Sequence, residues 1–300
     1  MIRIVDPHVH LFDLAQGKYA WLHPHNPPFW PDKDNIHHSY TPADLCLSAP
    51  LQITGCVHIE AGFDNAQPWR ELASVDKMFA QWQISSPLSR CASIATCDLT
   101  LATTKFINQI NPFFDYAHCV GVRHILDENA LSLLSNPQVL TNLHYLADKQ
   151  YIFEAQFDLT DESVVTAIEQ WFATRETPAI WVVDHASIGC QTDPMKWHSN
   201  LQRLAQIPTL IVKASGWEMA DRHYAHARIV EALGALIQFF GVERVMLASN
   251  FPVSLLRSTY QEYWQQMVTV CKDLGLDEHS QRCLFEQTAL ATYFSSPSTK

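Results

Sequence analysis

The chain has 300 residues, of which 47% are hydrophobic and 17% are charged, a composition typical of a globular protein with a sizeable core. Its formal net charge is −11 at pH 7, which argues against a nucleic acid or an anionic membrane surface as the partner, because both bind basic surfaces. No apolar run approaches the length of a membrane-spanning helix, and the N-terminus lacks the basic and apolar regions of a signal peptide.

The chain begins with an apolar run that leads into Asp6-Pro7-His8-Val9-His10. In an extended strand, residues two apart point to the same face, so His8 and His10 present two imidazoles side by side. Imidazole nitrogens suit zinc and similar transition metals, and two of them could bind one cation. His-x-His alone also fits two ordinary histidines at a strand end, so the rest of the chain has to supply the context.

The next segment, residues 11–40, is long and carries Trp21, Phe29, Trp30, several prolines and four histidines. Loops of this length without regular structure are usually functional or disordered, and the aromatic content argues against disorder. We interpret the segment as a lid over an active site, with Trp21 among its substrate contacts. A packed surface excursion is equally compatible with the sequence.

From there on, apolar runs with strand character alternate with helical patterns, and we count eight such pairs. The predicted strands are residues 2–5, 53–59, 91–96, 119–124, 151–157, 179–185, 209–214 and 245–249. The predicted helices are residues 68–84, 136–149, 161–173, 193–206, 228–240, 258–274 and 277–294.

This alternation predicts a single (β/α)8 barrel domain over residues 1–300, with a lid at about 11–40 and a C-terminal helix at about 277–294. A doubly wound open sheet is the alternative. It is disfavoured because no Gly-x-Gly-x-x-Gly follows any of the predicted strands, and because eight strand–helix units favour a closed barrel.

The eight cysteines have no Cys-x-x-Cys pair and no zinc-ribbon spacing. Several of them lie in or beside apolar runs, where a free thiol behaves as a small hydrophobic side chain. We therefore predict no disulfide framework and a reducing, cytoplasmic compartment.

In a barrel of this kind the active site lies at the C-terminal ends of the strands. Polar or titratable residues stand there on seven of the predicted strands. They are His8 and His10, His58 and Glu60, Arg123 and His124, Glu154 and Gln156, Asp184 and His185, Lys213, and Ser249 and Asn250. Each has an ordinary structural explanation by itself, but their common position predicts an active site.

Several of these pieces resemble a known family. The stretch DPHVH at 6–10 is similar to the Asp-x-His-x-His of the first strand in the amidohydrolase superfamily. The further stretches are VHIEA at 57–61, GVRH at 121–124, DH at 184–185, KASG at 213–216 and SNFPV at 249–253. In this order they resemble the branch that holds L-fuconolactonase, L-rhamnonolactonase and pyrone dicarboxylate lactonase, from residue 2 to about residue 294.

The resemblance implies hydrolysis of a small ester or lactone, such as a sugar-acid lactone, as the small-molecule substrate. It implies His8, His10 and His185 as ligands of a divalent cation, zinc or manganese. In members of the branch that work without a metal, the same histidines would polarise the substrate carbonyl. Arg123 would hold a carboxylate or hydroxyl of the substrate, a task suited to its planar donor fork.

One position departs from the family pattern. The superfamily usually ends its eighth strand with a catalytic Asp, and here the residue is Asn250. An amide cannot take a proton from water at neutral pH, so another group must be the general base. We favour Glu60 as the base, with His58 as a second candidate and Asn250 orienting a water or the substrate. The alternative is that Glu60 only pairs with Arg123 or a histidine.

The remaining expectations concern neighbouring side chains and other functions. His124 would orient polar groups of the substrate ring together with Arg123, and Trp217 would cover the ring together with lid aromatics. Asp184 is expected to face outward, because it is adjacent to His185 on the strand. A decarboxylase of an aromatic acid and a non-catalytic binder of sugar acids or lactones are the alternative functions. The oligomeric state stays open, a homodimer included.

Overall fold

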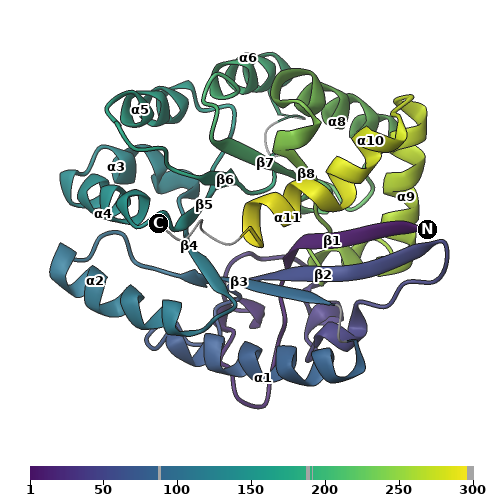
Figure 1. The fold of residues 1–300 in the computed structure, drawn as a ribbon, viewed down its shortest axis with the longest axis horizontal. Helices are drawn as coiled ribbons and strands as arrows, with labels where there is room; N and C mark the ends of the chain where they lie inside the picture. Colours follow the sequence, from purple (N-terminus) through teal and green to yellow (C-terminus); the bar gives the residue numbers. More distant parts are fainter. Residues whose placement is uncertain (87–88, 187–189, 191, 296–300) are drawn as a thin grey trace.

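The computed structural model describes residues 1–86, 89–186, 190 and 192–295. Within them, eight parallel strands form one sheet in which each strand pairs with the next along the chain. Figure 1 shows the strands at the centre with helices around them, which confirms the predicted (β/α)8 barrel. The strands are β1 Ile2–Val9, β2 Leu51–Ile59, β3 Arg90–Thr96, β4 Cys119–Ile125, β5 Ile152–Gln156, β6 Trp181–Val183, β7 Leu210–Ala214 and β8 Val245–Leu247.

The barrel closes where the end of β1 meets the segment after β8. Val9 forms a parallel bridge with Phe251, and the backbone N–H of His10 donates to the carbonyl of Phe251 at 2.7 Å. Deeper inside, the buried carboxylate of Asp6 accepts hydrogen bonds from the backbone N–H of Ser249 at 3.1 Å and from the hydroxyl of Tyr260 at 3.0 Å. Asp6 thus ties the first strand to the last part of the chain.

The helices pack their apolar stripes against the outside of the barrel. In the first long helix, for example, Leu72, Val75 and Phe79 recur at three-to-four spacing, and all three are buried. The α-helices are α1 Trp69–Ser85, α2 Thr103–Ile110, α3 Ala130–Leu134, α4 Pro137–Asp148, α5 Glu162–Ala173, α6 Pro194–Leu204, α7 Trp217–Ala220, α8 His226–Phe240, α9 Tyr260–Asp273, α10 Glu278–Arg282 and α11 Thr288–Tyr293.

The prediction of eight strand–helix pairs is wrong in its first unit. Between β1 and β2, a stretch that the structure describes throughout, the chain forms short 3-10 turns and no α-helix. Conversely, α2 lies in a stretch for which we predicted no helix. The predicted C-terminal helix is present, but it is divided into α10 and α11 by a π-helical turn at Cys283–Gln287.

The segment 11–40 is held in place by a buried lysine side chain. Lys33 is only 2% exposed, and its ammonium donates to the backbone carbonyls of Trp21, His23 and Asn26 at 2.7, 3.2 and 2.8 Å. The indole N–H of Trp21 in turn donates to the carbonyl of Ala61 at 2.8 Å, just after β2. The segment is therefore an ordered excursion that is anchored to the C-terminal end of the barrel.

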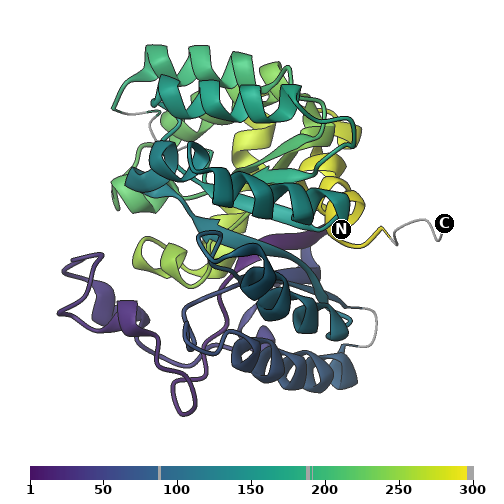
Figure 2. The same cartoon turned by 90° about the vertical axis from the view of Figure 1, so that its left-hand side faces the viewer.

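The opposite end of the barrel is closed by the C-terminal helix. Figure 2 shows residues 11–40 on one side of the molecule and α11 on the other. Ala289 and Tyr293 of α11 belong to the apolar cluster that fills the barrel, together with Val5, Val182 and Met246. The hydroxyl of Tyr293 donates to the Glu154 carboxylate at 2.6 Å, so this helix reaches the polar residues inside the barrel.

None of the helices in the described part of the chain combines the length and the apolar character needed to cross a membrane.

Candidate active site

A cavity of about 520 Å³ opens at the C-terminal ends of the strands. Trp21, Pro27, Pro28 and Trp30 of the segment 11–40 form one wall, which supports the interpretation of this segment as a cover over the site. The polar lining residues come from the strand ends and the loops after them: His10, Glu60, Asn65, Arg123, Asp127, Glu128, Gln156, His185 and Asn250. Six of the ten residues that we proposed for the site, Trp21 among them, therefore line the cavity.

The cover is joined to the loop after β7 by Arg222. Its guanidinium donates to the carboxylate of Asp32 at 2.9 Å and stacks over the ring of Trp30, 4.6 Å from the ring centre. Trp30 meets Trp21 edge to face, with ring centres 6.5 Å apart. These contacts hold two aromatic faces over the cavity.

His8 and His10 bring two ring nitrogens together at the base of the cavity. Their Nε2 atoms are 3.2 Å apart. Nδ1 of His10 is 3.0 Å from the carbonyl oxygen of Ile59, which can only accept, so Nδ1 carries the proton and Nε2 keeps its lone pair. Burial lowers the pKa of both imidazoles well below the usual value, with Lys213 adding to the effect at His8 and Arg123 at His10. Both rings are therefore neutral and can act as ligands.

His185 follows β6 in a left-handed backbone conformation, with φ of 51°. Its ring centre is 4.5 Å from that of His8, and its Nδ1 is 2.9 Å from the hydroxyl of Ser215. Burial lowers its pKa to about 4. Gly216 packs directly on this histidine: a Cβ at this position would lie 2.8 Å from the Cβ of His185. Gly216 therefore leaves the space in which the third imidazole sits.

Beneath the histidines lies a buried charge network centred on Lys213. Its ammonium is 2.6 Å from the Glu154 carboxylate, 3.0 Å from that of Asp184 and 3.2 Å from Nδ1 of His8. Burial works to raise the pKa of Asp184, but Lys213 and His8 outweigh it and hold that pKa well below the usual value. Burial and the charge of Asp184 raise the pKa of Glu154 to about 8.

The expectation that Asp184 faces outward is wrong. Its Oδ1 is 3.2 Å from Nδ1 of His8, and its Oδ2 is 3.4 Å from the guanidinium of Arg123. Alternation places Asp184 on the same face as Val182, which belongs to the apolar cluster inside the barrel. Strand β6 ends at Val183, and the left-handed backbone of His185 brings its side chain to the interior as well.

Glu60 and Arg123 form a buried ion pair on the cavity wall. The Glu60 carboxylate accepts from Nε and Nη2 of Arg123 at 2.9 and 2.7 Å, and Nη2 also donates to the Glu60 carbonyl at 3.0 Å. The other end of the guanidinium faces Asp184. The charge of Arg123 is thus matched by two protein carboxylates.

Asn250 lies just after β8 with φ of 59°, and it lines the cavity. Its side-chain amide donates to the carboxylate of Glu218 at 2.6 Å. Glu218 is buried in the short helix α7, and burial raises its pKa to about 7. The hydrogen-bond partner of the Asn250 side chain is therefore the titratable carboxyl group of Glu218.

Three proposed site residues are turned away from the cavity. Nε2 of His58 lies 3.2 Å from the Glu71 carboxylate, and its Nδ1 accepts from the backbone N–H of Leu11. Both ring nitrogens therefore already have partners within the protein. Nδ1 of His124 is 2.9 Å from the carbonyl oxygen of Cys97. Trp217 is buried at the start of α7, and its neighbour Met219 lines the cavity instead. These placements do not support roles for the three in contacting substrate.

Glu218, Asp127 and Glu128 are site residues that the sequence analysis missed. Asp127 and Glu128 follow β4 within three residues, and Glu218 follows β7 by four. A search for titratable residues up to four positions beyond each strand end would have found them. The sequence analysis considered only residues at the strand ends themselves.

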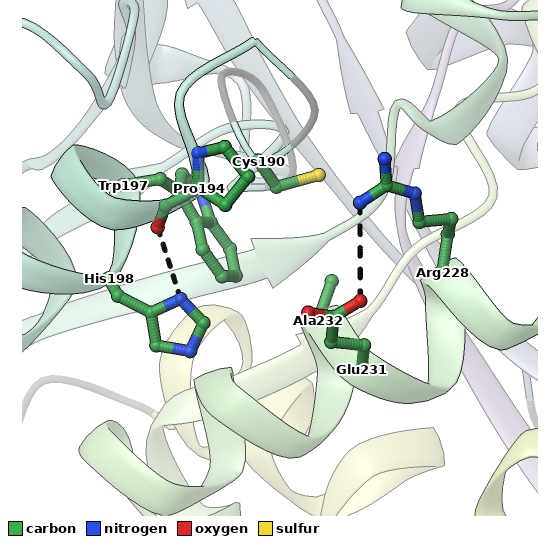
Figure 3. A pocket seen from close by; sticks show the side chains of 7 residues that line it. All are labelled: Cys190, Pro194, Trp197, His198, Arg228, Glu231 and Ala232. Carbon is green, nitrogen blue, oxygen red and sulfur yellow. Dashed lines mark hydrogen bonds and ion pairs between the residues drawn. The ribbon is translucent and has the colours of Figure 1, made fainter.

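A second hollow lies between α6 and α8 and is shown in Figure 3. It is lined by Cys190, Pro194, Trp197, His198, Arg228, Glu231 and Ala232, and its volume is about 10 Å³. This is room for about one water molecule, so the hollow is no substrate site.

The residues at the base of the cavity fit a divalent cation. Two nitrogens that bind one tetrahedral zinc ion at 2.0–2.1 Å lie about 3.3 Å from each other, close to the 3.2 Å between the Nε2 atoms of His8 and His10. Ligand atoms of His8, Glu154 and Asp184 also lie within 4.8 Å of one another. The Lys213 ammonium already contacts all three of these residues, however, and its charge would repel a second cation among them.

Residues 5–294 match the family model described as "Amidohydrolase". An uncharacterised protein of Sinorhizobium fredii is 24% identical over 97% of this chain and 98% of its own length. The L-fucono-1,5-lactonase of Burkholderia multivorans is 26% identical over 47% of this chain and 52% of its own length. A crystal structure of an amidohydrolase from Burkholderia multivorans with bound zinc has a TM-score of 0.76 and 19% identity, and covers 98% of this chain and 99% of its own.

Proposed function

This chain belongs to the amidohydrolase family and is a hydrolytic enzyme, and from that premise we propose that it hydrolyses a small, uncharged, hydroxylated lactone or cyclic ester. The observation that carries the proposal is the group of three neutral imidazoles, His8, His10 and His185, beside the Glu60–Arg123 pair at one cavity. Neutral nitrogens suit a metal ion, and a carboxylate next to them suits general-base catalysis.

His8, His10 and His185 would hold the cation. A divalent ion bound by them would lower the pKa of a water molecule and polarise a carbonyl. The carbonyl of Ile59 fixes the orientation of the His10 ring through Nδ1, as partners of ligating histidines commonly do. Asp184 and Lys213 both contact Nδ1 of His8.

Glu60 acts as the general base in this proposal. Its pairing with Arg123 holds the carboxylate at the cavity wall, where it can accept a proton from water. The water oxygen adds to the lactone carbonyl carbon, the ring C–O bond breaks, and the leaving oxygen takes up a proton to give the hydroxy acid. Asn250 contributes an amide and no base.

The charge of the cavity favours an uncharged substrate. Its lining includes the acidic residues Glu60, Asp127 and Glu128 and one guanidinium, Arg123, which is already paired. A substrate carboxylate would face these three acidic side chains, and the guanidinium of Arg123 is already paired with protein carboxylates. The faces of Trp21 and Trp30 suit the apolar side of a sugar ring.

The test is a panel of lactones, with and without a ring carboxylate, assayed for acid release with added zinc or manganese. We expect uncharged sugar lactones to be hydrolysed with kcat/KM at least about 10-fold above carboxylated ones, a difference of about 1.4 kcal/mol. Preference for a carboxylated lactone would overturn the substrate class. Release of carbon dioxide from aromatic acids, or binding without turnover, would identify the two alternative functions.

Glu60→Gln tests the assignment of the base. We expect kcat to fall by about 10²- to 10⁴-fold, the usual contribution of a general base. The variant keeps the shape of the side chain, and its carbonyl still accepts from Arg123. A variant with wild-type rate and pH–rate profile would remove Glu60 from the mechanism.

A further inference from the structure

Glu218 is a buried acid for which the mechanism above has no use. Its side chain is almost completely enclosed at 1% exposure. One oxygen, Oε1, accepts the hydrogen bond from Nδ2 of Asn250 at 2.6 Å. The other, Oε2, is buried and has no hydrogen-bond partner among the residues that the structure describes. An unpaired buried carboxylate oxygen is costly, so its presence next to the cavity calls for an explanation.

The carboxylate decides which end of the Asn250 amide faces the cavity. An ionised carboxylate can only accept, so the atom of Asn250 next to it must be the NH2 group. The amide oxygen Oδ1 is then the remaining polar atom of a side chain that lines the cavity. Asn250 therefore offers an acceptor, and not a donor, to a molecule bound there.

Resting on the hydrolysis proposed above, we propose that Glu218 is a positioning residue that acts through Asn250. Its carboxylate fixes the amide so that Oδ1 accepts a hydrogen bond from the attacking water, whose proton Glu60 removes. The pair replaces one function of the usual strand-eight carboxylate, which is to orient the water. It leaves proton removal to Glu60, after β2.

Protonation of Glu218 would reverse the amide. A proton on Oε2 would find no acceptor among the described residues, whereas a proton on Oε1 finds one when the Asn250 amide turns its Oδ1 toward Glu218. The NH2 group would then face the cavity and could not accept from water. The other titratable or charged groups acting on Glu218 are Arg222, Tyr224 and Tyr263, and of these only Arg222 is charged near neutral pH. Because burial raises the pKa of Glu218 to about 7, the amide should reverse within the pH range in which the activity is assayed.

The kinetic test is Glu218→Gln, which keeps the shape but has no ionisation. We expect kcat at pH 8 to fall by about 10- to 100-fold, the range for loss of a group that orients a catalytic residue, with KM within about 2-fold. The inflection of log kcat near pH 7 should vanish. Glu169→Gln, which removes a half-exposed carboxylate paired with Arg203, serves as the control and should leave kcat unchanged. An unchanged kcat, or a change in KM alone, overturns the proposal.

A second measurement needs no substrate. The side-chain amide signal of Asn250 in a ¹H–¹⁵N spectrum, assigned by its loss in Asn250→Ser, should shift with a midpoint near pH 7 in the wild-type protein and stay constant in Glu218→Gln. A signal that does not respond to pH in the wild type overturns the link between the two residues, even if the lactone panel succeeds. A titrating signal with no lactone hydrolysed would instead place the failure in the proposed function.

Discussion

Lys213→Met is expected to lower the free energy of unfolding by about 3–5 kcal/mol at pH 8, the cost of leaving buried charge without its partner. Lys213 is fully buried, and its ammonium is the cation nearest to the carboxylates of both Glu154 and Asp184. Methionine keeps most of the volume, so packing contributes little to the loss. Urea-induced unfolding followed by tryptophan fluorescence measures the effect.

The pH dependence separates charge from packing. Without Lys213, the pKa of Glu154, which is already raised in the wild type, rises further, and that of Asp184 rises above its value in the unfolded chain, so both must bind protons to remain buried. The stability deficit is then small at pH values below the unfolded pKa and grows as the pH rises, so it should be larger at pH 8 than at pH 6. Lys196→Met, at an exposed ion pair with Asp193, should cost less than about 1 kcal/mol.

Two outcomes decide the interpretation of this network. Adding Glu154→Gln to Lys213→Met should recover part of the lost stability, because one of the two unpaired acids is removed. A Lys213→Met protein that unfolds within about 1 kcal/mol of the wild type at both pH values would show that the network contributes no stability.

His10→Ala is expected to abolish metal binding and to reduce kcat/KM by about 10³-fold, which corresponds to the several kcal/mol that a bound cation contributes to the transition state. The variant removes one of two nitrogens that lie 3.2 Å apart and leaves the other with a single neighbouring imidazole. Zinc and manganese per chain, measured by elemental analysis of protein purified without chelator or histidine tag, give the first readout. Activity on the best lactone gives the second.

His118→Ala is the matched control. His118 is also buried, next to the hydroxyl of Ser93, but it precedes β4 at the opposite end of the barrel. The His118→Ala variant should have a lower free energy of unfolding than the wild type and the same metal content. If His10→Ala retained the wild-type metal content, the three histidines would not be the ligands. If no metal were bound by the wild type even after supplementation, the imidazoles would have to act on the substrate carbonyl directly.

The barrel could be predicted from the sequence because buried parallel strands are nearly continuous apolar runs. The runs at 53–59 and 119–124, for instance, agree with β2 and β4 to within two residues at each end. The set of strand-end residues followed from the same pattern, since parallel strands bring their C-terminal ends to one face. Short α2 escaped prediction because its eight residues hold few apolar positions.

The direction of individual side chains was not predictable in this way. His58 and Glu60 are two residues apart and were expected to share a face. Strand β2 ends at Ile59, however, so Glu60 turns toward Arg123 while His58 points to Glu71 on α1. The partner of Asn250 was hidden for another reason. Glu218 comes close only because a short helix follows β7, and no local pattern connects residues 218 and 250.

Contacts between the C-terminal part of the chain and the strands determine when the barrel can close during translation. The hydrogen bond from Tyr293 to Glu154 spans 139 positions of the chain, and that from Tyr260 to Asp6 spans 254. A chain that grows from its N-terminus holds all three imidazoles well before the residues that enclose them exist. The ring of strands cannot close until Phe251 has been made, and the growing sheet keeps open edges until then. The set of catalytic side chains is therefore complete only once Asn250 has been made, well after the third imidazole.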